Sequence, residues 1–229
     1  MTNSNATQLI MASGRKARDA AREARTEVYR QHILEAAERV FAERGYEVAK
    51  VAEIAQDCAL SMGTIYAIFP GKAELYGALL EARGQELLRL ARELAARNLP
   101  PRAALLALAD VYIDYFVEHP EFLRMHLRSG ASWALGSATG APGQMGTWRD
   151  IHALQADIFR RGVEAGEFVD QEPGYLSRTF SAMDQVLLAE WVAGGMRDDR
   201  DILTRRFRDM VERAFCLRLP AVRYRRTAG

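Results

Sequence analysis

The sequence predicts an all-α protein in which a small N-terminal domain is followed by a larger helical domain. Apolar residues recur at spacings of three and four along successive segments, which is the period of a helix that buries one face. No segment favours a strand. In addition, residues 51–69 hold two short apolar sets separated by a tight break, which indicates two helices joined by a turn.

Composition places the chain among ordinary globular proteins. Its 229 residues suffice for one or two domains, and 49% of them are hydrophobic and 27% charged. No apolar run reaches the roughly 18 residues of a membrane span, and the first residues lack the pattern of a signal peptide. We therefore expect a cytoplasmic protein with no membrane contact. The net charge of +1 does not by itself indicate a nucleic-acid partner.

The patterns that would indicate an enzyme or a metal protein are missing from the sequence. There is no G-x-S-x-G, no H-E-x-x-H, no phosphate-binding loop and no dinucleotide glycine pattern. Cys58 and Cys216 lie at apolar helical positions, so we expect buried thiols rather than a disulfide. The histidines are scattered and make no metal-ligand spacing. We expect no catalysis, no cofactor and no metal ion.

A first helix is expected from about Thr26 to Arg44, because it carries an apolar stripe and Gly45 follows it as a terminating glycine. The stripe consists of Ile33, Ala36, Ala37, Val40 and Phe41. Ahead of this helix, residues 1–25 are expected to form a flexible basic arm. Its basic side chains, diluted by acidic ones, are interpreted either as a solvated charged segment or as a contact to phosphates.

Two short helices are expected next, near 51–58 and 62–68, and together they predict a helix-turn-helix. The apolar positions of the first are Val51, Ile54, Ala55 and Cys58, and those of the second are Ile65, Ile68 and Phe69. The small side chain of Ala55 suits the point where the two helices cross. In this geometry the second helix enters the major groove of DNA.

The larger domain is expected to contain helices near 72–97, 102–118, 121–129, 147–165, 173–194 and 199–217. Pro101 suits the first turn of one of them, and His119-Pro120 separates two others. Between 130 and 146 the chain is rich in Gly, Ala and Ser, which predicts a long loop. A basic tail is expected at 219–229.

The helix-turn-helix lies inside a longer motif: Phe-x-x-x-Gly-Tyr, then Val-x-x-Ile-Ala, then Ser-x-Gly-Thr-Ile-Tyr-x-x-Phe-Pro-x-Lys-x-x-Leu. The residues that carry it are Phe41, Gly45, Tyr46, Val51, Ile54, Ala55, Ser61, Gly63, Thr64, Ile65, Tyr66, Phe69, Pro70, Lys72 and Leu75. Over residues 30–76 the chain resembles the TetR/AcrR family of bacterial transcriptional regulators. The resemblance implies a DNA-binding domain at 26–72 and a helical effector-binding and dimerisation domain at 73–218. It also implies a homodimer that binds double-stranded operator DNA, most often a repressor released by a small molecule.

Three positions depart from the pattern of the resembled family. Ala59 stands where the turn usually has glycine, and a positive φ there would cost about 1–2 kcal/mol. Lys50 replaces the usual Ser or Thr, which removes a hydroxyl cap and adds a cation suited to phosphate. Ile68 replaces a residue that is often His or Tyr, so one backbone contact of the relatives is not carried over.

Base contacts are expected from the start of the second motif helix, because short recognition helices present their N-terminal side chains to base edges. The candidates are Met62, Thr64 and Ala67, with Gly63 allowing close approach of the backbone. Thr64 can offer its hydroxyl to a base and its methyl group to thymine.

Four side chains are candidates for phosphate contacts. Lys72 stands at a helix N-terminus, where amides and an ammonium group together suit a phosphate. Tyr66 is interpreted as a phosphate donor or as a packed aromatic, and Lys50 as a phosphate contact or as a solvated charge. Ser61 is interpreted equally as a helix cap and as a phosphate contact.

The aromatic residues of the larger domain are interpreted either as ordinary core or as the lining of an effector pocket. The pocket residues that we predict are Tyr112, Phe116, Phe122, His126, Trp148, His152 and Met183. They indicate an apolar or aromatic ligand, with the two histidines able to orient a polar group.

A homodimer is expected through the helices at 173–194 and 199–217, which form the subunit interface in the resembled family. Their apolar residues include Leu176, Phe180, Leu187, Phe207, Met210 and Val211. A twofold dimer predicts a near-palindromic operator. The alternative function is a helical protein-interaction module that does not bind DNA, and the choice between repressor and activator stays open.

Overall fold

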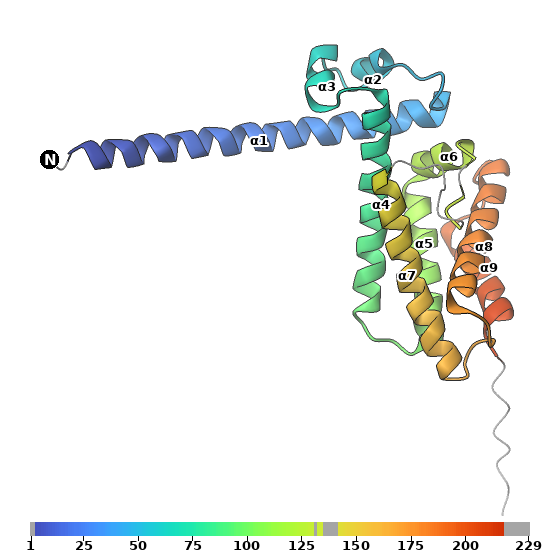
Figure 1. Ribbon diagram of the computed structural model, residues 1–229. Coiled ribbons are helices and arrows are strands. Elements are labelled where there is room, and N and C mark those ends of the chain that lie inside the picture. The colour runs from blue at the N-terminus through green and yellow to red at the C-terminus, as the bar shows by residue number, and fades with distance from the viewer. Residues whose placement is uncertain (1–2, 131, 135–141, 218–229) are drawn as a thin grey trace, which may run out of the picture. The chain divides into compact units, whose positions relative to one another are not determined.

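The computed structural model describes residues 3–130, 132–134 and 142–217, with side chains described from Lys16 onward except at Ala17 and residues 142–145. The basic tail expected at 219–229 and part of the loop expected at 130–146 lie outside the described residues. Within them the chain forms α1 (Asn3–Arg44), α2 (Val51–Asp57), α3 (Met62–Ile68), α4 (Lys72–Ala95), α5 (Pro101–Glu118), α6 (Pro120–Arg128), α7 (Pro142–Glu164), α8 (Pro173–Ala193) and α9 (Arg200–Phe215). The predicted all-α fold is confirmed (Figure 1).

The chain divides into two compact units, residues 1–79 (the N-terminal unit) and residues 80–229 (the C-terminal unit). The division falls inside α4, whereas the sequence analysis placed the domain boundary at 72/73. The reason is that the first turns of α4 belong to the core of the N-terminal unit. Leu75 is fully buried there, and the Tyr76 ring lies 5.2 Å from the ring of Phe41.

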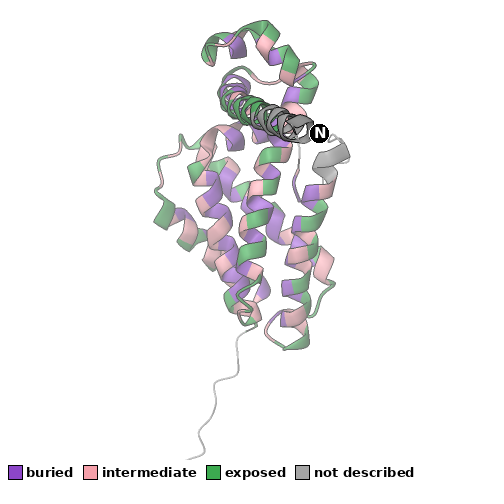
Figure 2. Cartoon of the chain, turned by 90° about the vertical axis from the view of Figure 1, so that its left-hand side faces the viewer, coloured by how far each residue is buried: buried purple, intermediate pink, exposed green. Residues whose placement is uncertain are grey.

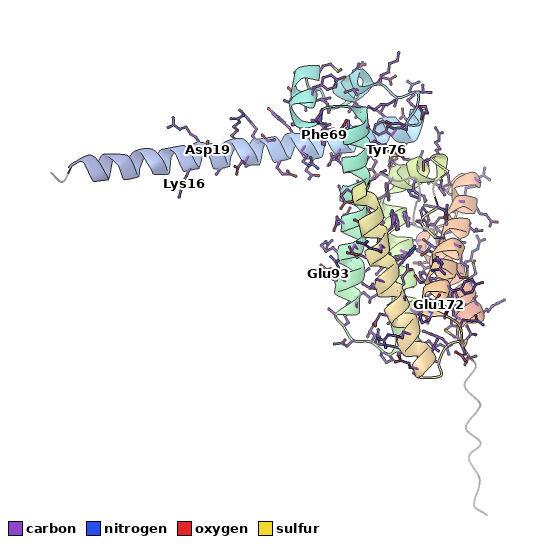
Figure 3. The ribbon with its side chains drawn as sticks, viewed as in Figure 1. Lys16, Asp19, Phe69, Tyr76, Glu93 and Glu172 are labelled. Carbon is purple, nitrogen blue, oxygen red and sulfur yellow. The ribbon has the colours of Figure 1, made fainter. Side chains whose placement is uncertain are left out.

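The first helix differs from the prediction at its start. It begins at Asn3 rather than near Thr26, so the segment expected to be a flexible arm is helical. The apolar stripe used for the prediction begins only at Ile33, but residues 15–31 are mostly Ala, Arg, Glu and Gln, which favour helices without any core contact. Lys16 and Asp19 stand out from this exposed extension (Figure 3).

The C-terminal end of α1 follows the expected chemistry. Gly45 adopts a φ of +78°, and its N–H donates to the Phe41 carbonyl at 2.9 Å. A left-handed residue at this position ends a helix, and glycine adopts it without a steric penalty. The predicted stripe of α1 is buried and packs on α2 and α3 (Figure 2).

The C-terminal unit is a bundle in which α5 packs against α7 and α9, and α8 packs against the same two helices. Proline occupies the first turn of α5, α6 and α8, where its missing N–H removes no hydrogen bond. The buried residues of these helices, coloured purple, lie along the inner sides of the bundle (Figure 2).

This core contains most of the apolar residues that the sequence analysis named on the two helices of the predicted dimer interface. The apolar residues named for the subunit interface are buried inside the C-terminal unit itself: Leu176, Phe180, Leu187, Phe207 and Val211. Met210 is half-buried. Side chains that fill a monomer core are inaccessible to a partner, so a dimer through α8 and α9 must use their opposite faces.

The segment after α7 is fixed to the end of α9. The Val169 N–H donates to the Phe215 carbonyl at 2.9 Å, and the Leu217 N–H donates to the Glu167 carbonyl at 2.8 Å. Phe168 between them is buried so closely against α7 that a Cβ on Gly162 would lie 2.0 Å from its ring. Only glycine therefore fits at position 162.

Cys58 and Cys216 are free thiols, and both are half-buried rather than buried as predicted. Across the described residues, histidines, cysteines and carboxylates form no group of three that could hold a metal ion. In the same part of the chain, no helix combines the length and apolarity that crossing a membrane requires.

Candidate nucleic-acid interface and buried polar cluster

The turn between α2 and α3 is closed by backbone hydrogen bonds. The Leu60 N–H donates to the Ala55 carbonyl at 3.0 Å, and the Ala59 N–H donates to the Gln56 carbonyl at 3.3 Å. Ala59 adopts a φ of +53°, in the left-handed region that disfavours a side chain. The positive φ considered in the sequence analysis is therefore present, with its cost of about 1–2 kcal/mol.

The start of α3 is fixed by Ser61, which acts as its N-cap. The Ser61 hydroxyl oxygen accepts from the Thr64 N–H at 3.0 Å and lies 2.8 Å from the Thr64 hydroxyl. This cap satisfies one of the backbone donors that a helix leaves free at its start. It also engages the Thr64 hydroxyl, which keeps further hydrogen-bonding capacity for a base because a hydroxyl has one donor and two acceptor sites.

One face of α3 is exposed and the other anchors it. Met62 is 36% and Tyr66 47% exposed, and Ser61, Gly63 and Ala67 are exposed as well. We call these five residues the α3 ridge. The opposite side is held by the buried Ile65, and the buried Phe69 follows the helix. A Cβ added to Gly63 would have only one described atom within 4 Å, the Ser61 hydroxyl oxygen at 3.7 Å, so the ridge is open there.

Lys50 stands at the N-cap of α2, where the expected hydroxyl is missing. Its backbone N–H donates to the Glu53 carboxylate at 2.9 Å. This bond is one of the two hydrogen bonds of a capping box. The Lys50 side chain is exposed. It remains a candidate phosphate contact.

Lys72 has a different role from the one expected. Its ammonium group donates to the carbonyl oxygens of Tyr46 at 2.7 Å, Glu47 at 3.2 Å and Ala49 at 3.2 Å. The ammonium nitrogen also lies 4.5 Å from the centre of the Tyr46 ring. An ammonium group has three donors, so none is left for a phosphate in this arrangement. Lys72 binds the loop between α1 and α2 to the start of α4, and the predicted phosphate contact would require it to give up one of these bonds.

In the C-terminal unit four aromatic rings form what we call the aromatic stack: Phe116, Phe122, Trp133 and Trp148. Three of them are predicted pocket residues, and Trp133 is the fourth. The Phe116 and Trp133 rings are 5.0 Å apart at 13°, and the Trp133 and Trp148 rings are 6.2 Å apart at 13°. The Phe122 ring lies nearly parallel to the Phe116 ring, with 6.2 Å between their centres and 7° between their planes. The His126 ring lies 4.7 Å from Trp133. All five side chains are buried.

A chain of hydrogen bonds runs through the same core. The Gln155 amide donates to the Tyr112 hydroxyl at 2.8 Å, and its oxygen accepts from Ser177 at 2.7 Å and from Ser181 at 3.2 Å. Asp184 follows one turn after Ser181 on the buried face of α8 and is 1% exposed. We call Tyr112, His126, His152, Gln155, Ser177, Ser181 and Asp184 the buried polar cluster.

Three atoms of the cluster have no hydrogen-bond partner in the described part of the chain: His126 Nε2, His152 Nε2 and Asp184 Oδ1. Burial lowers the pKa of His126 to about 4. Burial also lowers the pKa of His152, helped by the charge of Arg178 and opposed by a hydrogen bond with the Trp133 backbone. Burial raises the pKa of Asp184 well above its ordinary range, and it raises the pKa of Tyr112 too.

The structure brings six of the seven predicted pocket residues into this region, and the seventh, Met183, is half-buried on α8. The sequence analysis missed Trp133, Gln155, Ser177, Ser181 and Asp184. A signal was present for the last three, because polar residues at spacings of four and three on the apolar face of a helix are unexpected in an ordinary core.

A surface cavity of about 570 Å³ lies elsewhere in the C-terminal unit, between α5, α9 and the segment after α7. Its floor is apolar, and no predicted pocket residue lines it. The charged groups at its rim are paired, with Arg208 3.0 Å from Asp110 and Arg102 3.0 Å from Glu212. This cavity therefore offers space but no unpartnered polar group.

The N-terminal unit is similar in sequence to known bacterial regulators. Residues 33–79 match the family model described as bacterial regulatory proteins, tetR family. The chain is 30% identical over 99 residues to the uncharacterized HTH-type transcriptional regulator YuxN of Bacillus subtilis, over 43% of this chain and 34% of that one. It is 34% identical over 90 residues to the HTH-type transcriptional activator FasR of Mycolicibacterium smegmatis, over 39% of this chain and 41% of that one. These matches span well under half the length of either relative.

Among solved structures, the transcriptional regulator FadR from Bacillus subtilis, in complex with stearoyl-CoA, has the same fold. The TM-score is 0.67 at 15% identity, and the alignment covers 79% of this chain and 96% of that one. The shared fold extends the similarity beyond the N-terminal unit. The N-terminal unit therefore contains a domain of the tetR family of bacterial regulatory proteins by sequence, and most of the chain shares the fold of a solved transcriptional regulator.

Proposed function

We propose that this protein is a homodimeric DNA-binding transcriptional regulator whose affinity for its operator is set by a small molecule. The observation that supports DNA binding most strongly is the α3 ridge. It is exposed, it is anchored from behind by Ile65, and its start is fixed by the Ser61 cap. A preorganised, open helix face of this kind fits the major groove of a DNA duplex.

In this proposal Met62, Thr64 and Ala67 contact base edges, and the glycine at 63 lets the backbone approach closely. Tyr66 and Lys50 contact phosphates, while Ser61 serves mainly as the cap. The ridge has no Arg, Asn or Gln for two-pronged recognition of a base. Direct base recognition is therefore modest, and contacts to the DNA backbone supply much of the affinity.

The proposed dimer uses the outward face of α8. Tyr175 is 54% and Val186 57% exposed, and Ala182 and Ala193 on the same helix are exposed too. Small and apolar side chains on an exposed helix allow close packing against a second copy. Val186→Glu would place a carboxylate in this contact, and sedimentation velocity would then show monomers. A Val186→Glu protein that sediments as the wild type would exclude this face from the interface.

We propose repression, relieved by the effector, as the mode of regulation. The resemblance to the family supports repression, whereas the relative FasR is named as an activator. The effector is proposed to bind the C-terminal unit, and the neighbour in complex with stearoyl-CoA supports a ligand-binding role for this fold. Such a ligand acts by binding one of two conformations more tightly and so shifting their populations. Because its target is DNA, we place the protein in the cytoplasm.

Selection from a pool of random duplexes at low ionic strength tests DNA binding for any operator sequence. We expect enrichment of a near-palindromic sequence whose half-sites lie about one helical turn apart or farther. Reporter expression from that sequence then decides between repression and activation. A pool that shows no enrichment would favour the alternative, a helical module that binds proteins and not DNA.

A further inference from the structure

The part of α1 that precedes the core of the N-terminal unit is exposed on all sides. Each side chain described between Lys16 and Val28 is exposed, so this segment buries no face in the described part of the chain. The helix continues well beyond α2 and α3 (Figure 1). Helices in proteins owe most of their stability to the packing of one face. A helical extension that packs on nothing therefore indicates a partner outside the chain.

The charged residues of this extension are sorted by sign into two rows. The arginine row consists of Arg18, Arg22 and Arg25, and the acidic row consists of Asp19, Glu23 and Glu27. Spacings of three and four place the members of a row on one side of a helix. At about 3.6 residues per turn, the centres of the two rows lie roughly a third of a turn apart.

This sorting distinguishes the extension from an ordinary solvated helix. Opposite charges three or four residues apart stabilise an exposed helix, and like charges at those spacings destabilise it. The arginine row has the unfavourable pattern throughout. Neither Arg22 nor Arg25 has a side-chain hydrogen bond or ion pair in the described part of the chain. By contrast, Arg39 and Arg89 each pair with a carboxylate, at 2.6 and 2.7 Å. An anionic partner would relieve the repulsion within the arginine row.

The arginine row lies on the helix-turn-helix side of α1. Arg25 and Arg39 stand nearly four helical turns apart, so their side chains leave the helix in almost the same direction. Arg39 donates to Asp57 at the end of α2 at 2.6 Å, so this direction points toward α2. Lys16 stands two and a half turns from Arg25 and therefore leaves the opposite side of the helix. Figure 3 shows Lys16 below α1, on the side away from α2 and α3.

The length of the row fits a duplex that lies against the α3 ridge. Arg30 marks the place where α1 passes the end of α3, because its guanidinium carbon lies 5.0 Å from the centre of the Phe69 ring. At about 1.5 Å per residue, Arg25 lies roughly 8 Å and Arg18 roughly 18 Å farther along α1. One turn of duplex DNA is about 34 Å long and carries about one negative charge per 1.7 Å. The row therefore reaches about half a turn of DNA past α3, where it can meet several phosphates.

We propose that the arginine row binds the phosphates of the duplex segment that flanks the bases contacted by the α3 ridge. This inference rests on the proposed function, because it adds a second contact surface to the same duplex. Phosphate contacts fix position and supply affinity but carry no base information. The row therefore strengthens binding whatever the flanking sequence is, and it supplements a ridge that has no side chain for two-pronged recognition of a base.

Arg22→Gln/Arg25→Gln tests the row in the full-length protein. Glutamine favours helices, and both arginines are exposed, so circular dichroism and the melting temperature should match the wild type. The ligand is a labelled duplex enriched by the wild type and extended by arbitrary sequence on both sides. Fluorescence polarisation over a salt series measures its binding. We expect at least a tenfold loss of affinity at about 0.1 M salt, and a salt slope smaller by about two for each bound protomer.

Two controls separate a local contact from an effect of net charge. Arg149→Gln/Arg197→Gln removes the same charge from exposed positions of the C-terminal unit, and Lys16→Gln removes a charge from the opposite side of the extension. Both control proteins should bind with the affinity and salt slope of the wild type. The inference is overturned if Arg22→Gln/Arg25→Gln keeps the wild-type slope, or if Arg149→Gln/Arg197→Gln loses as much affinity.

The outcomes also distinguish this inference from the proposed function. Enrichment of a duplex that the Arg22→Gln/Arg25→Gln protein binds like the wild type would remove only the arginine row. Binding to arbitrary duplexes that depends on Arg22 and Arg25, without enrichment of any sequence, would remove base recognition by the α3 ridge and leave the row standing. A wild-type protein that binds no duplex at low ionic strength would overturn both.

Discussion

The two units of this protein treat their polar side chains in opposite ways. In the N-terminal unit the polar groups around the helix-turn-helix are satisfied: Lys72 donates to three carbonyls, and Ser61 caps α3. In the C-terminal unit, Asp184, His126 and His152 each keep a buried atom without a partner among the described residues. The first arrangement holds a surface in one shape before DNA arrives. The second leaves polar atoms inside the unit without a partner among the described residues.

The largest expected difference in stability between the two units comes from replacing one glycine in each by alanine. Gly162→Ala should destabilise the C-terminal unit by about 3 kcal/mol, because the new Cβ would lie 2.0 Å from the buried Phe168 ring. Gly63→Ala, on the open α3 ridge, should leave stability unchanged or slightly higher, because alanine favours a helix. Urea unfolding measures both. The same Gly63→Ala protein should bind duplex DNA more weakly. An equal loss of stability in the two variants would contradict the difference in packing between the two positions.

The pH dependence of stability should come from the C-terminal unit. The pKa of His126 is about 4 in the folded state and about 6.5 when unfolded, so folding disfavours protonation. Its contribution is present above pH 6.5 and is lost as the pH falls toward 4, by up to about 3 kcal/mol. Asp184 acts in the opposite direction, since its raised pKa makes folding less favourable as the pH rises above the ordinary carboxyl range.

Urea unfolding at pH 7 and pH 4.5 measures the effect of His126. In a His126→Asn protein the difference between the two pH values should shrink. An unchanged difference would show that His126 does not cause it.

Within the N-terminal unit, replacing Lys72 should affect stability, whereas replacing Lys50 should affect DNA binding. Lys72→Ala should lower the free energy of unfolding by about 2 kcal/mol, because three backbone carbonyls lose a charged donor. Lys50→Ala should leave stability unchanged, because its side chain is exposed, and should reduce the salt dependence of duplex binding by about one unit of slope. If Lys72→Ala instead changes only the salt slope, Lys72 returns to the list of phosphate contacts.

The smallest expected effect concerns the turn of the helix-turn-helix. Ala59→Gly should stabilise the N-terminal unit by about 1 kcal/mol, because glycine adopts the observed φ of +53° without a steric penalty. Thermal unfolding followed by circular dichroism detects a change of this size. A lower melting temperature would mean that the added freedom of the unfolded chain outweighs the relieved strain.

Features that depend on local residue spacing could be predicted from the sequence, whereas features that depend on tertiary contacts could not. The α3 ridge depends on local spacing, so its exposed and buried positions followed from the motif. The partners of Lys72 are backbone carbonyls of a loop, which leave no trace in residue identity. The start of α1 was missed because a helix of Ala, Arg and Glu needs no apolar stripe. Asp184 was within reach, since it continues the spacing of Ser177 and Ser181, but Trp133 and Gln155 reach Ser181 only in the folded unit.

The central claim is that the α3 ridge lies against a DNA duplex, and Ala67→Glu tests it most directly. Ala67 is exposed, so a carboxylate there should leave the melting temperature unchanged while repelling phosphates and base acceptors. Ala165→Glu makes the same exchange at an exposed position of the C-terminal unit. For a duplex enriched by the wild type, we predict at least a hundredfold loss of affinity for Ala67→Glu and none for Ala165→Glu. Full affinity of a folded Ala67→Glu protein would contradict the account.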